Sequence, residues 1–145
     1  MKNSIIKVII TIVVMVLVTG CGSDYKKLSY VDYNEYFNKK EGYMMIDDSS
    51  KNGLEIIREL QASNGDIQVI YMEFSNDEEA RKYIRDTYTS EDGYKLKTKD
   101  NYTIIKDTKA RYFKLYRVDN IIIYASANDK KNKREINNIF KDLGY

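Results

Sequence analysis

The side chains of this chain that could do chemistry are mostly carboxylates, because the sequence has no His and a single cysteine, Cys21. Without His there is no imidazole general base, no His-assisted nucleophile and no His metal ligand. One cysteine forms no intramolecular disulfide, and neither a Gly-x-Ser-x-Gly motif nor a glycine-rich phosphate loop occurs. Catalysis by this chain would therefore have to rely on its acids.

Three acidic groups are candidates for acid–base catalysis or calcium binding: Asp47-Asp48, Asp77-Glu78-Glu79 and Glu91-Asp92. The second group stands at a predicted helix start, where acids stabilise the helix dipole. The other two fall in predicted loops, where solvated acids are common, and no Asp-x-Asp-x-Asp-Gly calcium loop occurs. We therefore predict no catalytic, cofactor-binding or metal site.

Cys21 follows a segment that has the order of a secretion signal. Lys2 and Lys7 form a positive n-region, and small residues follow the apolar stretch from Val8 to Val18. This stretch is shorter than the roughly 20 apolar residues of a transmembrane helix, and it fits a secretory h-region. The sequence Val18-Thr19-Gly20-Cys21 resembles the lipobox of bacterial lipoproteins, with Val18 where family members usually have Leu.

The resemblance to bacterial lipoproteins covers only the leader, and it implies a domain organisation. It implies a signal peptide over residues 1–20, a lipidated Cys21 with a short tether over 21–27, and one extracytoplasmic domain over 28–145. Two acyl chains suffice for stable membrane attachment, so we expect a lipid-anchored protein on the outer face of the cell membrane. An uncleaved membrane anchor with an incidental cysteine is the alternative.

Composition indicates a balanced domain from a low-GC Gram-positive bacterium. The sequence has 24 basic residues, of which Lys2 and Lys7 lie in the leader. The remaining 22 equal the acidic residues in number, which are also 22. A domain without net charge has no global field to attract nucleic acid, and we expect no such partner. Tyr, Asn, Lys and Ile have AT-rich codons, and the bias explains the 14 tyrosines better than a tyrosine-built binding site does.

Cations and aromatic rings alternate in the segment from Arg111 to Arg117. A strand there places Tyr112, Lys114 and Tyr116 on one face and Phe113 and Leu115 on the other. The pattern fits a partner-binding sheet face, or rings that pack across strands on a half-exposed sheet. We favour the second interpretation.

Periodicity and capping residues predict three helices, at Ser29–Lys40, Asn76–Tyr88 and Asp129–Leu143, with Ser29 and Ser75 as N-caps of the first two. Alternating or continuous apolar runs predict strands at 43–46, 67–74, 94–99, 102–106, 111–118 and 121–127. Segment 54–62 has helical spacing, but the Asn64-Gly65 turn signal after it favours the first strand of a hairpin.

This order of elements predicts an α+β, two-layer domain, with an antiparallel sheet of about five or more strands and three helices packed against it. Ferredoxin-like and cystatin-like folds are the nearest analogues, and such analogy carries no function. The expected core residues are Ile70, Met72, Phe74, Ile84, Phe113, Leu115, Ile123, Ile136, Ile139, Phe140 and Leu143.

The expected function is that of a non-catalytic binding module at the cell surface, with a protein, peptide or cell-wall glycan as partner. The alternative is a carboxylate-based hydrolase acting on cell-wall glycan, which needs two acids about 5–9.5 Å apart across a cleft. A pair among Asp47, Asp48, Glu73, Glu91 and Asp92 that meets in a pocket with a raised pKa would favour the hydrolase.

Overall fold

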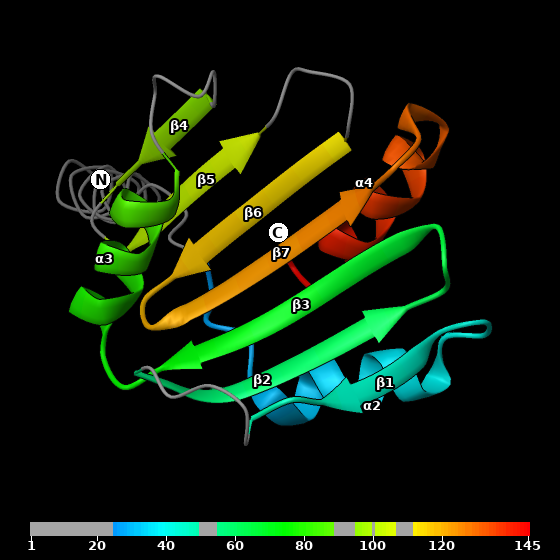
Figure 1. The fold of residues 1–145 in the computed structure, drawn as a ribbon, viewed down its shortest axis with the longest axis horizontal. Helices are drawn as coiled ribbons and strands as arrows, with labels where there is room; N and C mark the ends of the chain where they lie inside the picture. Colours follow the sequence, from blue (N-terminus) through cyan, green and yellow to red (C-terminus); the bar gives the residue numbers. More distant parts are fainter. Residues whose placement is uncertain (1–24, 50–54, 89–94, 100, 107–111) are drawn as a thin grey trace, which may run out of the picture.

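The computed structural model describes residues 25–49, 55–88, 95–99, 101–106 and 112–145. Within these ranges the chain forms one antiparallel sheet of seven strands, in the order β1-β2-β3-β7-β6-β5-β4, together with three α-helices (Figure 1). The predicted α+β class, antiparallel sheet and number of helices are confirmed. The predicted leader, Cys21, Glu91 and Asp92 lie outside the described residues.

The sheet is built from two sets of hairpins that join at its centre. Its strands are β1 (Met44–Asp47), β2 (Ile56–Ser63), β3 (Ile67–Phe74), β4 (Lys95–Thr98), β5 (Tyr102–Lys106), β6 (Tyr112–Val118) and β7 (Ile121–Ala127). The pairing of β3 with β7 brings the two sets together. The segment before Asn64-Gly65 is a strand, as the turn signal predicted, and Gly65 has a φ of +89° that favours glycine.

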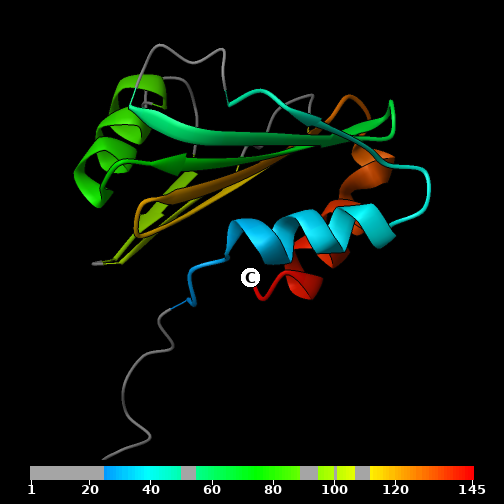
Figure 2. The ribbon, with the colours of Figure 1, turned by 90° about the horizontal axis from the view of Figure 1, so that it is seen from below.

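The helices lie on both faces of the sheet. Helices α2 (Tyr30–Lys39) and α4 (Lys133–Asp142) cover the same face, which we call face A (Figure 2). Helix α3 (Asp77–Thr87) packs on the opposite face, face B, where its Ala80 and Ile84 join a second hydrophobic cluster.

The starts of the helices show which capping predictions hold. Ser29 caps α2, and its Oγ accepts the backbone N–H of Asp32 at 3.0 Å. Helix α3 is capped by Asn76, whose Oδ1 accepts the N–H of Glu79 at 3.0 Å, so the prediction of Ser75 as the cap is wrong. Asn76 takes this role because its extended backbone places the short amide over the first turn.

Face A carries the larger core, in which Tyr33 and Phe37 of α2 and Ile136, Ile139 and Phe140 of α4 pack on the sheet. Nine of the eleven predicted core residues are buried. Ile70 is only partly buried because it lies on face B beside the cluster under α3, and Leu143 because it stands at the end of α4.

Candidate binding cleft

The segment that leads into α2, which we call the entering segment, is described from Tyr25 onward, and the ring of Tyr25 packs on face A. The ring stands edge-on to Tyr102, with centroids 4.9 Å apart, and to Tyr116 at 5.4 Å. Its backbone carbonyl accepts the side-chain amide of Asn101 at 3.3 Å. The backbone at Tyr25, five positions before the start of α2, is therefore already fixed on the sheet.

The end of α4 holds the same segment from the other side. Gly144 has a φ of +92°, which allows the chain to turn back, and the N–H of Tyr145 donates to the carbonyl of Phe140 at 2.7 Å. The turn places the Tyr145 hydroxyl where it accepts the backbone N–H of buried Leu28 at 3.1 Å. Residues 117 positions apart thus form one wall.

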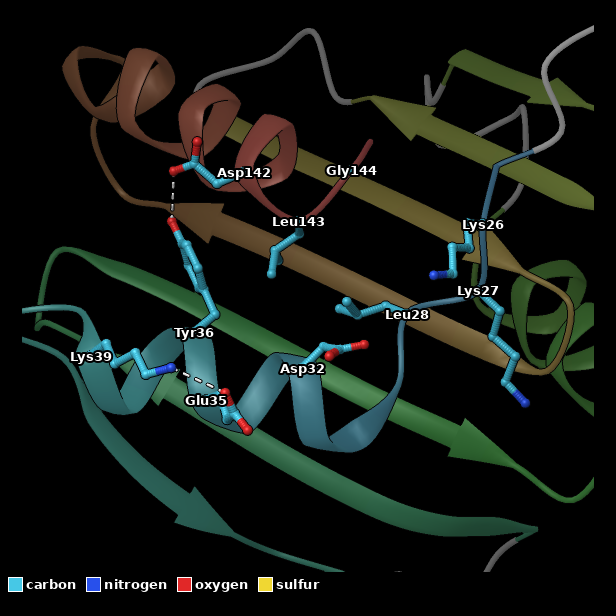
Figure 3. A pocket seen from close by; sticks show the side chains of 10 residues that line it. All are labelled: Lys26, Lys27, Leu28, Asp32, Glu35, Tyr36, Lys39, Asp142, Leu143 and Gly144. Carbon is cyan, nitrogen blue, oxygen red and sulfur yellow. Dashed lines mark hydrogen bonds and ion pairs between the residues drawn. The ribbon is translucent and has the colours of Figure 1, made fainter.

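A cleft of about 480 Å³ opens between the entering segment, α2 and the end of α4 (Figure 3). Its lining residues are Lys26, Lys27, Leu28, Asp32, Glu35, Tyr36, Lys39, Asp142, Leu143 and Gly144. The lining therefore combines three ammonium groups with three carboxylates and the aliphatic side chains of Leu28 and Leu143.

The carboxylates of the cleft all have neighbours in its wall. The Tyr36 hydroxyl donates to Asp142 at 3.0 Å, and this bond closes α2 against α4 (Figure 3). Lys39 pairs with Glu35 at 3.0 Å, and the Ser29 hydroxyl donates to Asp32 at 2.7 Å. Partial burial, followed by the bond to Asp142, raises the pKa of Tyr36, so its hydroxyl stays protonated as a donor.

Lys26 and Lys27 differ from the carboxylates, because their ammonium groups form neither an ion pair nor a hydrogen bond with the described residues. Both side chains are exposed at the mouth of the cleft (Figure 3). Exposed ammonium groups keep their hydration and can exchange it for an anionic ligand group at small cost. The cleft can thus bind a polar ligand through charges of both signs, with Leu28 and Leu143 as its apolar contacts.

The acids predicted from the sequence lie elsewhere. Asp47, Asp48 and Glu73 line neither this cleft nor four other clefts formed by the described residues. The Asp47 carboxylate accepts the N–H of Ser49 at 3.0 Å, and hydrogen bonds from Ser49 lower the pKa of Asp47. Glu73 faces Arg58 of the neighbouring strand at 3.5 Å. No two of these three acids therefore meet in any of these five clefts.

The acidic group at the start of α3 has the structural role expected of it. Asp77, Glu78 and Glu79 all stand in the first turn of the helix. Asp77 has a second role, because its carboxylate pairs with Arg117 of β6 and with Arg81 at 2.6 Å. Arg117 is fully buried on face B, and its pairing fixes the start of α3 to the sheet.

Alternation along β6 is as predicted, but the face that carries Tyr112, Lys114 and Tyr116 lies beneath α4. Lys114 and Tyr116 are buried, and the Lys114 ammonium and the Tyr112 hydroxyl both donate to Asn137 of α4, at 3.2 and 3.1 Å. The half-exposed sheet expected there is therefore wrong, because Ile136, Ile139 and Phe140 bring α4 over it. This face offers little surface to a partner.

The cleft could not be located from the sequence because its walls come from opposite ends of the chain. The bond of Tyr36 to Asp142, for example, joins residues 106 positions apart. Within the described residues, no group of three or more His, Cys, Asp and Glu side chains is arranged to hold a metal ion, and no helix is long and apolar enough to span a membrane. Comparison with family models, curated proteins and solved structures gives no match.

Proposed function

We propose that this chain is a lipid-anchored binding protein on the outer face of a bacterial cell membrane, with the cleft beside Lys26 and Lys27 as its ligand site. The observation that carries the proposal is the position of the cleft, five residues from the lipobox cysteine Cys21. Acylation of Cys21 would hold the cleft next to the membrane surface, where a tethered domain meets its partners.

The chemistry of the cleft favours a ligand that carries both charges. Lys26 and Lys27 suit a carboxylate or phosphate, and Asp32 and Asp142 suit an amine. A peptide segment, from a protein or from the wall, offers these groups together with apolar side chains for Leu28 and Leu143. A polysaccharide without charged groups would leave most of the lining unpaired, so we place peptide before glycan.

The test uses a photoreactive phenylalanine analogue at Lys39, in the cleft, in the full-length protein on intact cells. The same analogue at Met44, which is 75% exposed on the edge strand β1, is the matched control. We expect an adduct of discrete mass from the Lys39 position and none from Met44.

Charge reversal by Lys27→Glu should reduce the Lys39 adduct at least tenfold, whereas Lys130→Glu, an equal change at another exposed site, should leave it unchanged. Equal adducts from Lys39 and Met44, or no effect of Lys27→Glu, would rule out the cleft as the ligand site.

A further inference from the structure

Five exposed lysines surround the point where the chain enters the fold. They are Lys26 and Lys27 of the entering segment, Lys97 and Lys99 at the β4 edge, and Lys106 of β5; we call them the lysine face. None of the five forms an ion pair with the described residues. All belong to the surroundings of a single ring, that of Tyr25.

The lysine face lies around Tyr25 and its ring neighbours. Lys97 and Lys106 line a hollow of about 280 Å³ together with Tyr25 and Tyr116. The Lys99 ammonium lies 6.0 Å from the centre of the Tyr102 ring, which itself packs on Tyr25. Lys26 and Lys27 follow Tyr25 directly in the chain. The cations thus come from three segments that converge on the same place.

The balanced net charge of the mature chain hides a strong asymmetry. The segment from Lys95 to Val118 holds eight basic and two acidic residues, a net side-chain charge of +6. Because the mature chain is neutral as a whole, the remaining residues from Cys21 carry −6. Within this segment, the lysines that are both described and exposed include Lys97, Lys99 and Lys106, at β4 and β5. Asp119 follows the segment, and Asp32 and Asp142 line the cleft beside Lys26 and Lys27.

We propose that the lysine face rests on the anionic phospholipid headgroups of the membrane that holds the anchor. This inference rests on the proposed lipidation of Cys21, four positions before Tyr25. The chain from Cys21 to Tyr25 extends at most about 14 Å, which is within two Debye lengths of about 8 Å each at physiological ionic strength. The lysines are then within reach of the headgroup charge, and the acidic remainder of the domain is repelled from it. The edge at β4 and β5 faces the bilayer, and the β1 edge points away from it.

The experiment compares two dye positions in the full-length lipidated protein on vesicles. A cysteine introduced by Thr98→Cys reports from the β4 edge, and one introduced by Met44→Cys reports from the β1 edge at the other side of the sheet. Energy transfer to a headgroup-labelled lipid is measured on vesicles of phosphatidylcholine, with and without 30% phosphatidylglycerol. The mass of each preparation first establishes that Cys21 carries its lipid.

We expect phosphatidylglycerol to raise energy transfer from Thr98→Cys far more than from Met44→Cys, and 0.5 M NaCl to abolish the difference. Each lysine that is neutralised should lower the ratio of docked to undocked protein about fivefold. The triple variant Lys97→Gln/Lys99→Gln/Lys106→Gln should therefore lose docking, whereas replacement of the same three by Arg should retain it. The triple variant Lys82→Gln/Lys130→Gln/Lys131→Gln removes equal charge elsewhere and should behave as the wild type.

Equal energy transfer from both positions, or the same transfer on neutral vesicles, would overturn the docking proposal and leave the anchor intact. Docking that survives loss of Lys97, Lys99 and Lys106 would also overturn it. Absence of lipid on Cys21 is a separate result, seen in the mass before any vesicle is added, and it would overturn the proposed function itself.

Discussion

Lys114 is a buried cation without a carboxylate partner among the described residues. Its ammonium lies 4.8 Å from the centre of the Phe140 ring and 5.1 Å from that of Tyr116, and it donates one hydrogen bond, to Asn137. Burial, and secondarily the nearby charge of Lys106, lowers the pKa of Lys114 to about 8. The aromatic faces and one amide oxygen thus replace only part of the hydration that this cation has in water.

Stability should therefore rise with pH above 8. An unfolded lysine has a pKa of about 10.4, so between pH 8 and 10.4 the unfolded chain binds more protons than the folded one. The free energy of unfolding should increase by about 1–2 kcal/mol from pH 7.5 to 9.5, as measured by urea unfolding. Above this range the tyrosines oppose the gain, because burial raises the pKa values of Tyr36, Tyr71 and Tyr145 in the folded state.

The variant Lys114→Met serves as the control, since it keeps the volume of the side chain and removes the titration. Its stability should change little over the same pH range. A wild-type protein whose stability is flat from pH 7.5 to 9.5 would show that Lys114 is not desolvated as described.

Phe140 of α4 is a residue of the face A core. It is fully buried on α4 and its ring lies 4.9 Å from that of Tyr116. Phe140→Ala should lower the free energy of unfolding by about 3–5 kcal/mol, measured in denaturant. Val31→Ala, at a 58% exposed position of α2, should change it by less than about 0.5 kcal/mol. A loss below about 1 kcal/mol for Phe140→Ala would mean that α4 does not pack as described.

At the level of the elements, α3 is fixed to the sheet by charge as well as by apolar packing. Arg117 donates to Asp77 at the start of the helix, to the carbonyl of Asp119 at 3.0 Å and to the Thr103 hydroxyl at 3.3 Å. Its Nη2 atom has no partner among the described residues. A buried guanidinium that is held by one carboxylate makes that carboxylate costly to remove.

Asp77→Ala should therefore destabilise the protein by about 1–3 kcal/mol, a range reduced because the Asp77 side chain is 42% exposed. Glu78→Ala removes a neighbouring acid from the same first turn and controls for the helix dipole. It should cost less than about 0.5 kcal/mol. Equal losses for the two variants, in thermal or denaturant unfolding, would show that the pair with Arg117 adds nothing.

Most elements could be predicted because their signals are local. Caps, apolar periodicity and turn dipeptides act within a few residues, and Asn64-Gly65 correctly indicated a strand before it, which the structure shows as β2 (Ile56–Ser63). The sequence did not show which helices lie on the same face of the sheet. Arg117 and Asp77 are 40 positions apart, and their pairing depends on the long-range register of β3 with β7. The placement of α3 opposite α2 and α4 depends on the same pairing.

At the scale of the whole molecule, the candidate site was less predictable than the fold. The cleft needs the two ends of the chain together, through Tyr36 with Asp142 and Leu28 with Tyr145, and nothing local in the sequence marks either pair. Total composition likewise concealed the lysine face, since a net charge of zero does not say where the charges lie. Among the predicted acids, Asp77, Glu78 and Glu79 stand at a helix start as expected. The prediction of a loop at Asp47 is wrong, because Asp47 ends strand β1 and pairs with Leu60, and Glu91 and Asp92 lie outside the described residues.

The proposed attachment is common to both proposals, because it brings the cleft close to the membrane surface and the lysine face onto it. Its most direct test is metabolic labelling of cells with an alkyne fatty acid, followed by purification of the protein. We predict that the wild-type protein carries the label and that Cys21→Ala carries none, accumulating as uncleaved precursor or as a shed form. An unlabelled wild-type protein, or label that persists in Cys21→Ala, would contradict the account.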